Sequence, residues 1–184
     1  MAANLDFGPP SLEDAPAINE LINTAFRNTD PSDLYLPGKG NEVATIMDED
    51  RVIASINDPS CVVLVVRDPV TGAIVGHGIV HNRDETRAWI SMLAIDNAYR
   101  KRGVGGQIIA WAERYARREW AKPRMEFNVL SSRAPLIAWY KKRGYSLTGE
   151  SSPFVYQYYG DWKGVLRDDL SFVNLGKDLV EAQA

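Results

Sequence analysis

The amino-acid sequence predicts a mixed α/β fold in which helices pack on one mixed β-sheet. Residues 61–67, Cys-Val-Val-Leu-Val-Val-Arg, are rich in β-branched side chains and apolar on both faces, which is typical of a central strand. Over residues 18–26 and 108–116, in contrast, apolar residues recur at helical spacing. The chain of 184 residues has no linker or low-complexity tract, so we predict a single domain over residues 1–184.

Turn and cap residues divide the first half of the chain into elements. Ser11, Asp14 and Pro16 combine a capping residue, an early acid and a first-turn proline, and together they predict a helix start. Asp-Pro-Val-Thr-Gly at residues 68–72 has the composition of a hairpin turn. The predicted order is a short strand near the N-terminus, a helix to about residue 28, a loop over 28–40, a helix over 41–56, a strand over 61–67 and its hairpin partner over 73–81.

The second half continues this alternation of strands and helices. The predicted order is a strand over 86–95, whose apolar stretch 89–95 is expected to be buried, a loop over 100–106, a helix to about residue 120, a strand over 125–130, a helix over 132–143 ended by Gly144, and short strands over 145–148 and 170–175.

The loop between the strand and the helix in this half has the features of a phosphate site. A helix start leaves its first N–H groups without partners and carries partial positive charge, so it attracts an anion. Three glycines allow close backbone approach, and three basic residues add charge at the entrance. These residues are Gly103, Gly105, Gly106, Arg100, Lys101 and Arg102. The spacing is not the dinucleotide fingerprint, which needs glycine where the chain has Ile108, nor a P-loop, which ends in Gly-Lys-Ser/Thr.

At this loop the chain resembles the GNAT superfamily of acyl-CoA-dependent N-acyltransferases. The family's pyrophosphate signature, Arg/Gln-x-x-Gly-x-Gly/Ala after a central strand, matches Arg100, Gly103 and Gly105. A second block over residues 134–145, with Tyr140 ahead of Gly-Tyr, is similar to the family's later helix. Two ordered motifs are more specific than one. The resemblance implies the family's fold, a central mixed and largely antiparallel sheet flanked by helices.

The resemblance also implies where acetyl-CoA would bind. The loop amides would hold its pyrophosphate, the backbone of the strand over 86–95 would pair with its pantetheine arm, and the start of the later helix, where the family often has Asn, would contact it through Ser132 or Arg133. The implied cofactor-binding residues are Leu93, Ala94, Ile95, Arg100, Lys101, Arg102, Gly103, Val104, Gly105, Gly106, Ser132 and Arg133.

Tyr140 is the implied catalytic residue. Its phenol is protonated at pH 7 and could give a proton to the departing thiolate of coenzyme A. The alternative is a core aromatic on the same helical face as Leu136 and Ile137. The absence of a Gly-x-Ser-x-Gly elbow favours direct transfer without a covalent acyl-enzyme.

The group that removes the proton from the amine stays open. On the strand over 86–95 the alternating positions are Trp89, Ser91 and Leu93, and none of them is a base. The alternatives are a water chain or one of four side chains, His77, His81, Asp84 and Glu85. With two histidines, one cysteine and no metal-ligand spacing, we expect no metal.

Composition limits the partners and the location. A net charge of -3 and a pI near 5.4 argue against nucleic-acid binding. No apolar run approaches membrane-spanning length and the first residues lack the pattern of a signal peptide, so we expect no membrane partner. Cys61 is the single cysteine, which excludes an internal disulfide, and the expected location is the cytoplasm.

The sequence therefore predicts an acetyl-CoA-dependent N-acetyltransferase that transfers an acetyl group directly to a primary amine, with a small-molecule amine as partner. The alternatives are a non-catalytic acyl-CoA-binding or protein-interaction module and a protein or peptide N-acetyltransferase. We expect the loop over 28–40 and an aromatic tail to shape the acceptor site, although the tail could equally form a homodimer surface. The tail residues are Phe154, Tyr156, Tyr158, Tyr159 and Trp162.

Overall fold

The protein is described by a computed structural model that covers residues 5–27, 46–154 and 169–179. The chain forms two compact units, one made of Met1–Asn28, Ile46–Met125 and Asp178–Ala184 and the other of Thr29–Thr45 and Glu126–Lys177. The single domain over residues 1–184 stays a prediction. The loop predicted over 28–40, and the aromatic tail beyond Phe154, lie outside the described residues. Among the described helices, none has the length and apolar character needed to span a bilayer.

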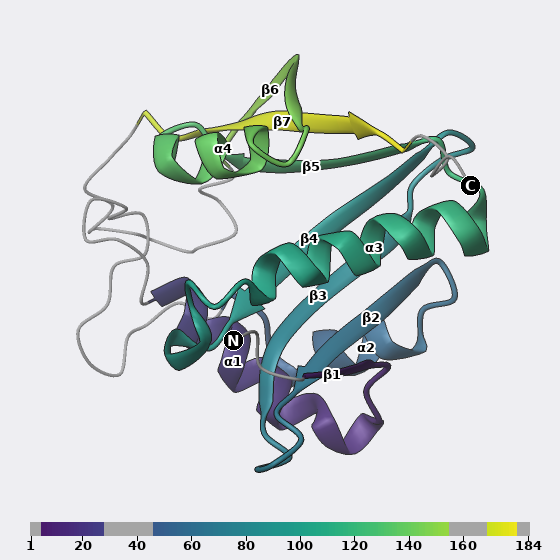
Figure 1. The fold of residues 1–184 in the computed structure, drawn as a ribbon, viewed down its shortest axis with the longest axis vertical. Coiled ribbons are helices and arrows are strands. Elements are labelled where there is room, and N and C mark those ends of the chain that lie inside the picture. Colours follow the sequence, from purple (N-terminus) through teal and green to yellow (C-terminus); the bar gives the residue numbers. More distant parts are fainter. Residues whose placement is uncertain (1–4, 28–45, 155–168, 180–184) are drawn as a thin grey trace. The chain divides into compact units, whose positions relative to one another are not determined.

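Four antiparallel strands form the sheet of the first unit (Figure 1). Their order is β1 (Asp6–Gly8), β2 (Cys61–Arg67), β3 (Ile74–Asn82) and β4 (Arg87–Ile95). β2 lies between β1 and β3 and its residues 63–66 are buried, which confirms the apolar run as an interior strand. The predicted turn joins β2 to β3, where Gly72 adopts a φ of 72° and its N–H bonds to the Asp68 carbonyl at 2.8 Å.

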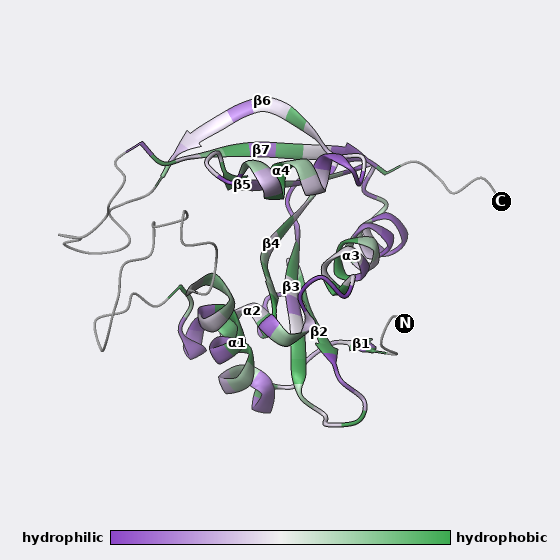
Figure 2. Cartoon of the chain, turned by 60° about the vertical axis from the view of Figure 1, so that its left-hand side comes forward, coloured by the Kyte–Doolittle hydropathy of each residue, from purple (hydrophilic) through white to green (hydrophobic). Residues whose placement is uncertain are grey.

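Helices cover both faces of this sheet. α1 (Ala15–Arg27) and α2 (Glu49–Asn57) lie on one side and α3 (Val104–Trp120) on the other (Figure 2). Two glycines of β3 allow α3 to lie close to the strand. A Cβ on Gly76 would lie 3.0 Å from Cδ1 of Ile108, and a Cβ on Gly78 would lie 3.2 Å from Cγ2 of Ile108. Since side chains alternate along a strand, His77 and His81 belong to the opposite face, toward α1.

The helix predicted over 41–56 includes residues 46–48, but in the structure these residues are not helical and α2 begins at Glu49. This part of the prediction is wrong. The Asp48 side chain caps the helix by accepting a hydrogen bond from the Arg51 N–H at 2.8 Å. The preceding segment is held by Asn23 of α1, which accepts from the Ile46 N–H and donates to the Met47 carbonyl, both at 2.8 Å. Helical spacing did not reveal that a buried asparagine competes for these backbone groups.

The second unit contains most of β5 (Arg124–Leu130), then α4 (Ala134–Lys141), β6 (Ser146–Pro153) and β7 (Ser171–Asp178), with β7 between β5 and β6. Its core is aromatic, since the Phe127 ring centroid lies 4.2 Å from that of Tyr140 and 4.8 Å from that of Tyr145. Gly144, at a φ of 88°, follows α4 as predicted. β6 runs well beyond the predicted end at residue 148, because a register shift lets it continue pairing with β7.

The predicted fold class is confirmed. The described residues contain helices together with seven strands, and the pairs β1–β2, β2–β3, β3–β4 and β6–β7 are antiparallel.

Candidate active site

A bulge in β4 is the central feature of the site in the first unit. His77 of β3 pairs with Ala94 and Ile79 pairs with Ser91, so Met92 and Leu93 together face one residue of β3. Met92 adopts a φ of 50°, which is uncommon for a residue other than glycine and is found where surrounding structure enforces it.

The bulge also changes which side chains share a face. Ser91 stays on the face of His81, but Leu93 turns to the α3 side and packs against the cluster that contains Val104 and Ile108. The predicted common face of Trp89, Ser91 and Leu93 is therefore wrong. The expectation of a buried stretch over 89–95 is also wrong, because of its seven residues only Ile90 and Ala94 are buried and the others are partly exposed.

The backbone N–H groups of β4 that follow the bulge alternate in direction. Asp96 N–H bonds to the Val75 carbonyl at 2.9 Å, and Ala94 pairs with His77 two residues earlier. Successive N–H groups in an antiparallel ladder point to alternate sides of a strand. Beyond the bulge, the N–H groups of Asp96 and Ala94 therefore point toward β3, and that of Ile95 points away from it.

His77 holds the bulge from the opposite strand. Its Nδ1 lies 2.9 Å from the Met92 carbonyl, and since a carbonyl only accepts, Nδ1 carries the hydrogen. The side chain is fully buried, and Nε2 has no hydrogen-bond partner in the described part of the chain. The hydrogen bond to Met92 raises the pKa of His77, but burial has the larger effect and lowers this pKa from 6.5 to about 4. His77 is thus a neutral imidazole at pH 7.

His81 makes a second cross-strand bond one residue from the bulge. Its Nε2 lies 2.8 Å from Oγ of Ser91, and both side chains are partly exposed. Burial lowers the pKa of His81 below its ordinary 6.5, while Asp58 raises it and Arg83 lowers it. The guanidinium of Arg83 stacks on Trp89, 4.0 Å from the ring centroid.

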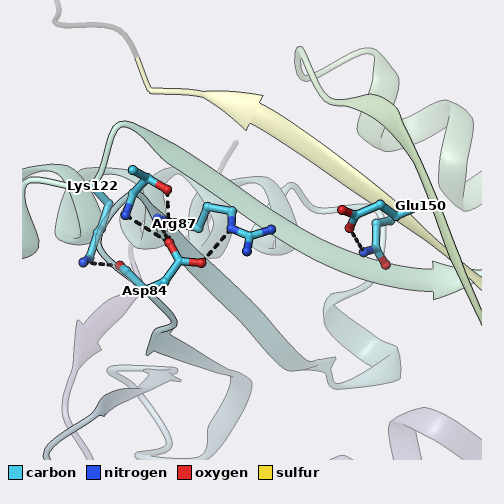
Figure 3. Close-up of polar contacts among 6 residues, drawn as sticks. Asp84, Arg87, Lys122 and Glu150 are labelled. Carbon is cyan, nitrogen blue, oxygen red and sulfur yellow. Dashed lines mark hydrogen bonds and ion pairs between the residues drawn. The ribbon is translucent and has the colours of Figure 1, made fainter.

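The two acidic candidates lie at the far end of the hairpin. Asp84 accepts hydrogen bonds from Thr86 and Arg87, and Lys122 Nζ donates to its backbone carbonyl (Figure 3). Burial raises the pKa of Asp84, but these hydrogen bonds outweigh it and bring the pKa to about 2. Glu85 is exposed in the same turn. Because Arg87 precedes Met92 by five residues, about 17 Å of strand separates this turn from the bulge.

The glycine loop ends in an uncapped helix start. Gly103 is the N-cap of α3 at a φ of 84°, and no side chain caps the helix. The N–H groups of Val104, Gly105 and Gly106 in the first turn therefore have no intrahelical acceptor, as an anion site requires. Lys101 also has a left-handed backbone, with a φ of 61°.

Contacts with the rest of the first unit hold this loop in place. Arg100 donates through Nη2 to the Ala25 carbonyl of α1 at 2.9 Å. The Tyr99 hydroxyl donates to the carboxylate of Asp68, and the Arg102 guanidinium lies 5.3 Å from the centroid of the Tyr99 ring. Lys101 and Arg102 are exposed, so their charges remain available to an anion.

The remaining predicted site residues belong to the second unit. Tyr140 lies on α4 with 6% exposure, and Ser132 and Arg133 directly precede this helix. Burial raises the pKa of Tyr140 to about 12, although Arg133 and Arg143 lower it. Tyr140 is therefore both a member of the aromatic core and a protonated phenol over the whole neutral range.

The fold and the glycine loop place the chain among the acyltransferases. It belongs to the acetyltransferase (GNAT) family, which matches residues 17–145. The predicted family is thus confirmed, and the protein is an enzyme of this class. A comparison with curated proteins finds no match.

Solved structures share the fold across the whole chain. The yncA protein from Salmonella typhimurium, solved with its cofactor acetyl-CoA, is 20% identical with a TM-score of 0.69 over 98% of this chain and 97% of that chain. Nourseothricin acetyltransferase is 18% identical with a TM-score of 0.65 over 98% and 100%. The ribosomal-protein-S18-alanine N-acetyltransferase from Escherichia coli is 15% identical with a TM-score of 0.65 over 97% and 96%. At these identities the likeness concerns the fold.

Sequence reasoning missed the two cross-strand contacts of the histidines. Their spacing of four did place His77 and His81 on one face, but their partners, the Met92 carbonyl and the Ser91 hydroxyl, depend on a bulge that shifts the pairing of β4. No local pattern in β4 signals that bulge.

Proposed function

We propose that the protein transfers the acetyl group of acetyl-CoA directly to a primary amine of a small molecule. The observation that carries this proposal is the combination, in one strand–loop–helix segment, of a bulged strand and an uncapped helix start. The first suits an extended acyl chain with a thioester, and the second suits a pyrophosphate.

The residues of this segment divide the binding of acetyl-CoA between them. The N–H groups of residues 103–106 would hold the pyrophosphate, with the charges of Lys101 and Arg102 beside them. The backbone groups of Leu93 and Ile95 would pair with the pantetheine arm and polarise the thioester carbonyl. Arg100 has a further role, because its bond to Ala25 ties the loop to α1. Ser132 and Arg133 complete the proposed set.

Tyr140 is the proposed general acid. Its burial keeps the phenol protonated, so it can donate a proton to the thiolate that leaves as the amine attacks. A pKa near 12 also means that ionisation of Tyr140 does not limit the rate below strongly alkaline pH.

The acceptor is the least determined part of this proposal. Among similar folds, one is named for nourseothricin and another for the alanine of ribosomal protein S18, so a small-molecule amine is the first candidate and a peptide amine is the second. The cytoplasmic location and the homodimer stay predictions.

Calorimetric titration of the purified protein with acetyl-CoA, with NADH and ATP as controls, tests the proposal. We expect 1:1 binding of acetyl-CoA and none of NADH, because the loop spacing is not that of a dinucleotide site. A Tyr140→Phe variant should bind acetyl-CoA as the wild type does and lose turnover in a thiol-release assay by about 100-fold or more. Unchanged turnover would remove Tyr140 as the acid, and a failure to bind acetyl-CoA would remove the proposal.

A further inference from the structure

We propose that Ser91 and His81 form a proton relay that accepts the proton of the attacking amine. This inference rests on the proposed function and assigns the group that the sequence left open. Its basis is one contact, Nε2 of His81 at 2.8 Å from Oγ of Ser91, together with the place of that contact in β4.

Ser91 stands where the amine must be deprotonated. It directly precedes Met92, and Leu93, two residues on, belongs to the backbone that is proposed to pair with the pantetheine arm and polarise the thioester. Two residues of strand span about 7 Å, so the hydroxyl of Ser91 lies within reach of an amine that attacks a carbonyl bound there. Ser91 is the single serine or threonine of β4, so it carries the only side-chain hydroxyl of this strand.

Accessibility separates the two histidines of this face. His77 is fully buried, and its Nδ1 hydrogen is committed to the Met92 carbonyl. His81 and Ser91 keep partial exposure, so a proton received by the imidazole can leave to water. Asp84 is excluded by its hydrogen bonds and, like Glu85, by its distance from the bulge.

The charge environment keeps His81 able to accept a proton at neutral pH. The charged groups that act on the ring are Asp58, which precedes β2, and Arg83, which follows β3, while β4 presents the uncharged Trp89 and Ser91. Burial, the largest influence, lowers the pKa of His81 and so favours the neutral ring, which is the form that can accept a proton.

The proton transfers balance as follows. The amine nitrogen forms the C–N bond with the acetyl carbon and gives a proton to Ser91 Oγ, while the Ser91 hydroxyl proton passes to Nε2 of His81. The C–S bond breaks with its electron pair on sulfur, which takes a proton from the Tyr140 hydroxyl. The imidazolium then releases its proton to solvent, and Tyr140 regains one from solvent.

Kinetics of four proteins test the relay: the wild type, His81→Gln, Ser91→Ala and Ser55→Ala. The glutamine amide can keep a hydrogen bond to Ser91 but cannot take a proton, which separates relay from packing. Ser55→Ala is the matched control, since this α2 hydroxyl donates a hydrogen bond to the Arg51 carbonyl within its own helix. Thiol release is followed with acetyl-CoA and a panel of spermidine, tyramine and lysine over pH 5 to 9.

We expect His81→Gln and Ser91→Ala to lower kcat by about 100-fold or more, to leave KM for acetyl-CoA within about twofold, and to lose the acidic limb of the rate profile. Ser55→Ala should behave as the wild type. A His81→Gln enzyme with wild-type kcat and pH profile would overturn the relay and leave the proposed function intact. A wild type that binds acetyl-CoA but releases no thiol with any amine of the panel would count against both.

A second readout needs no turnover. The chain contains two histidines, so in a His77→Asn protein the imidazole NMR signals belong to His81 alone. Adding Ser91→Ala should move the Nε2 chemical shift of His81 and its titration midpoint. An unchanged spectrum would show that the hydrogen bond does not exist in solution and would overturn the relay.

Discussion

His77 supplies the sharpest test of the bulge in β4. Replacing it with leucine removes the donor to the Met92 carbonyl while keeping a side chain of similar size. A part-buried carbonyl that loses its partner costs up to about 1–3 kcal/mol, and this cost falls on the bulged conformation. Since 1.4 kcal/mol is tenfold in an equilibrium constant, acetyl-CoA should bind about 5- to 150-fold more weakly.

Global stability should respond differently from binding. Nε2 of His77 is buried without a partner, so leucine also relieves a penalty of about the same size, about 1–3 kcal/mol. We therefore expect the free energy of unfolding of His77→Leu, measured with urea at pH 7, to stay close to the wild-type value while acetyl-CoA binding falls.

His77→Asn is the matched control, because the asparagine amide can place a donor close to the position of Nδ1. We expect it to restore most of the acetyl-CoA affinity in a calorimetric titration. If leucine and asparagine variants bound acetyl-CoA equally well, the hydrogen bond to Met92 would not maintain the site, and the reasoning from the bulge would be refuted.

Three further predictions concern stability and the loop. Folding lowers the pKa of His77 from 6.5 to about 4, so the unfolded chain binds a proton first as the pH falls. The contribution of His77 to the free energy of unfolding should be full above pH 6.5 and fall by an amount on the order of 3 kcal/mol between pH 6.5 and 4. Urea unfolding of His77→Asn should lack this part of the loss. Gly103→Ala and Gly72→Ala should each cost about 1–2 kcal/mol, since both glycines have positive φ with open space around the Cβ position, but only Gly103→Ala should weaken acetyl-CoA binding; equal binding by both would contradict the loop assignment. Asn23→Leu should lower the free energy of unfolding by about 2–5 kcal/mol because it leaves backbone groups of Ile46 and Met47 unpaired, and a loss below 1 kcal/mol would show that other groups replace these bonds.

Local chemistry in the sequence determined the elements and the conformation of the glycine loop. Helical spacing, the turn at residues 68–72 and the β-branched run of β2 each report a property of neighbouring residues, and the structure bears them out. The glycines of the loop are of the same kind, because a positive φ at Gly103 is a local requirement that the residue type reveals.

The tertiary structure alone decided the pairing of the two central strands. A bulge at Met92 changes the facing of every later residue of β4, and nothing in the residues around it marks the change, because the partner strand and its histidines impose it. The start of α2 follows the same logic, since Asn23 lies more than twenty residues away in the sequence. The periodicity of apolar residues in the sequence determines which residues lie on the same face of a helix or strand. Contacts between elements determine which atoms of the candidate site lie close to one another.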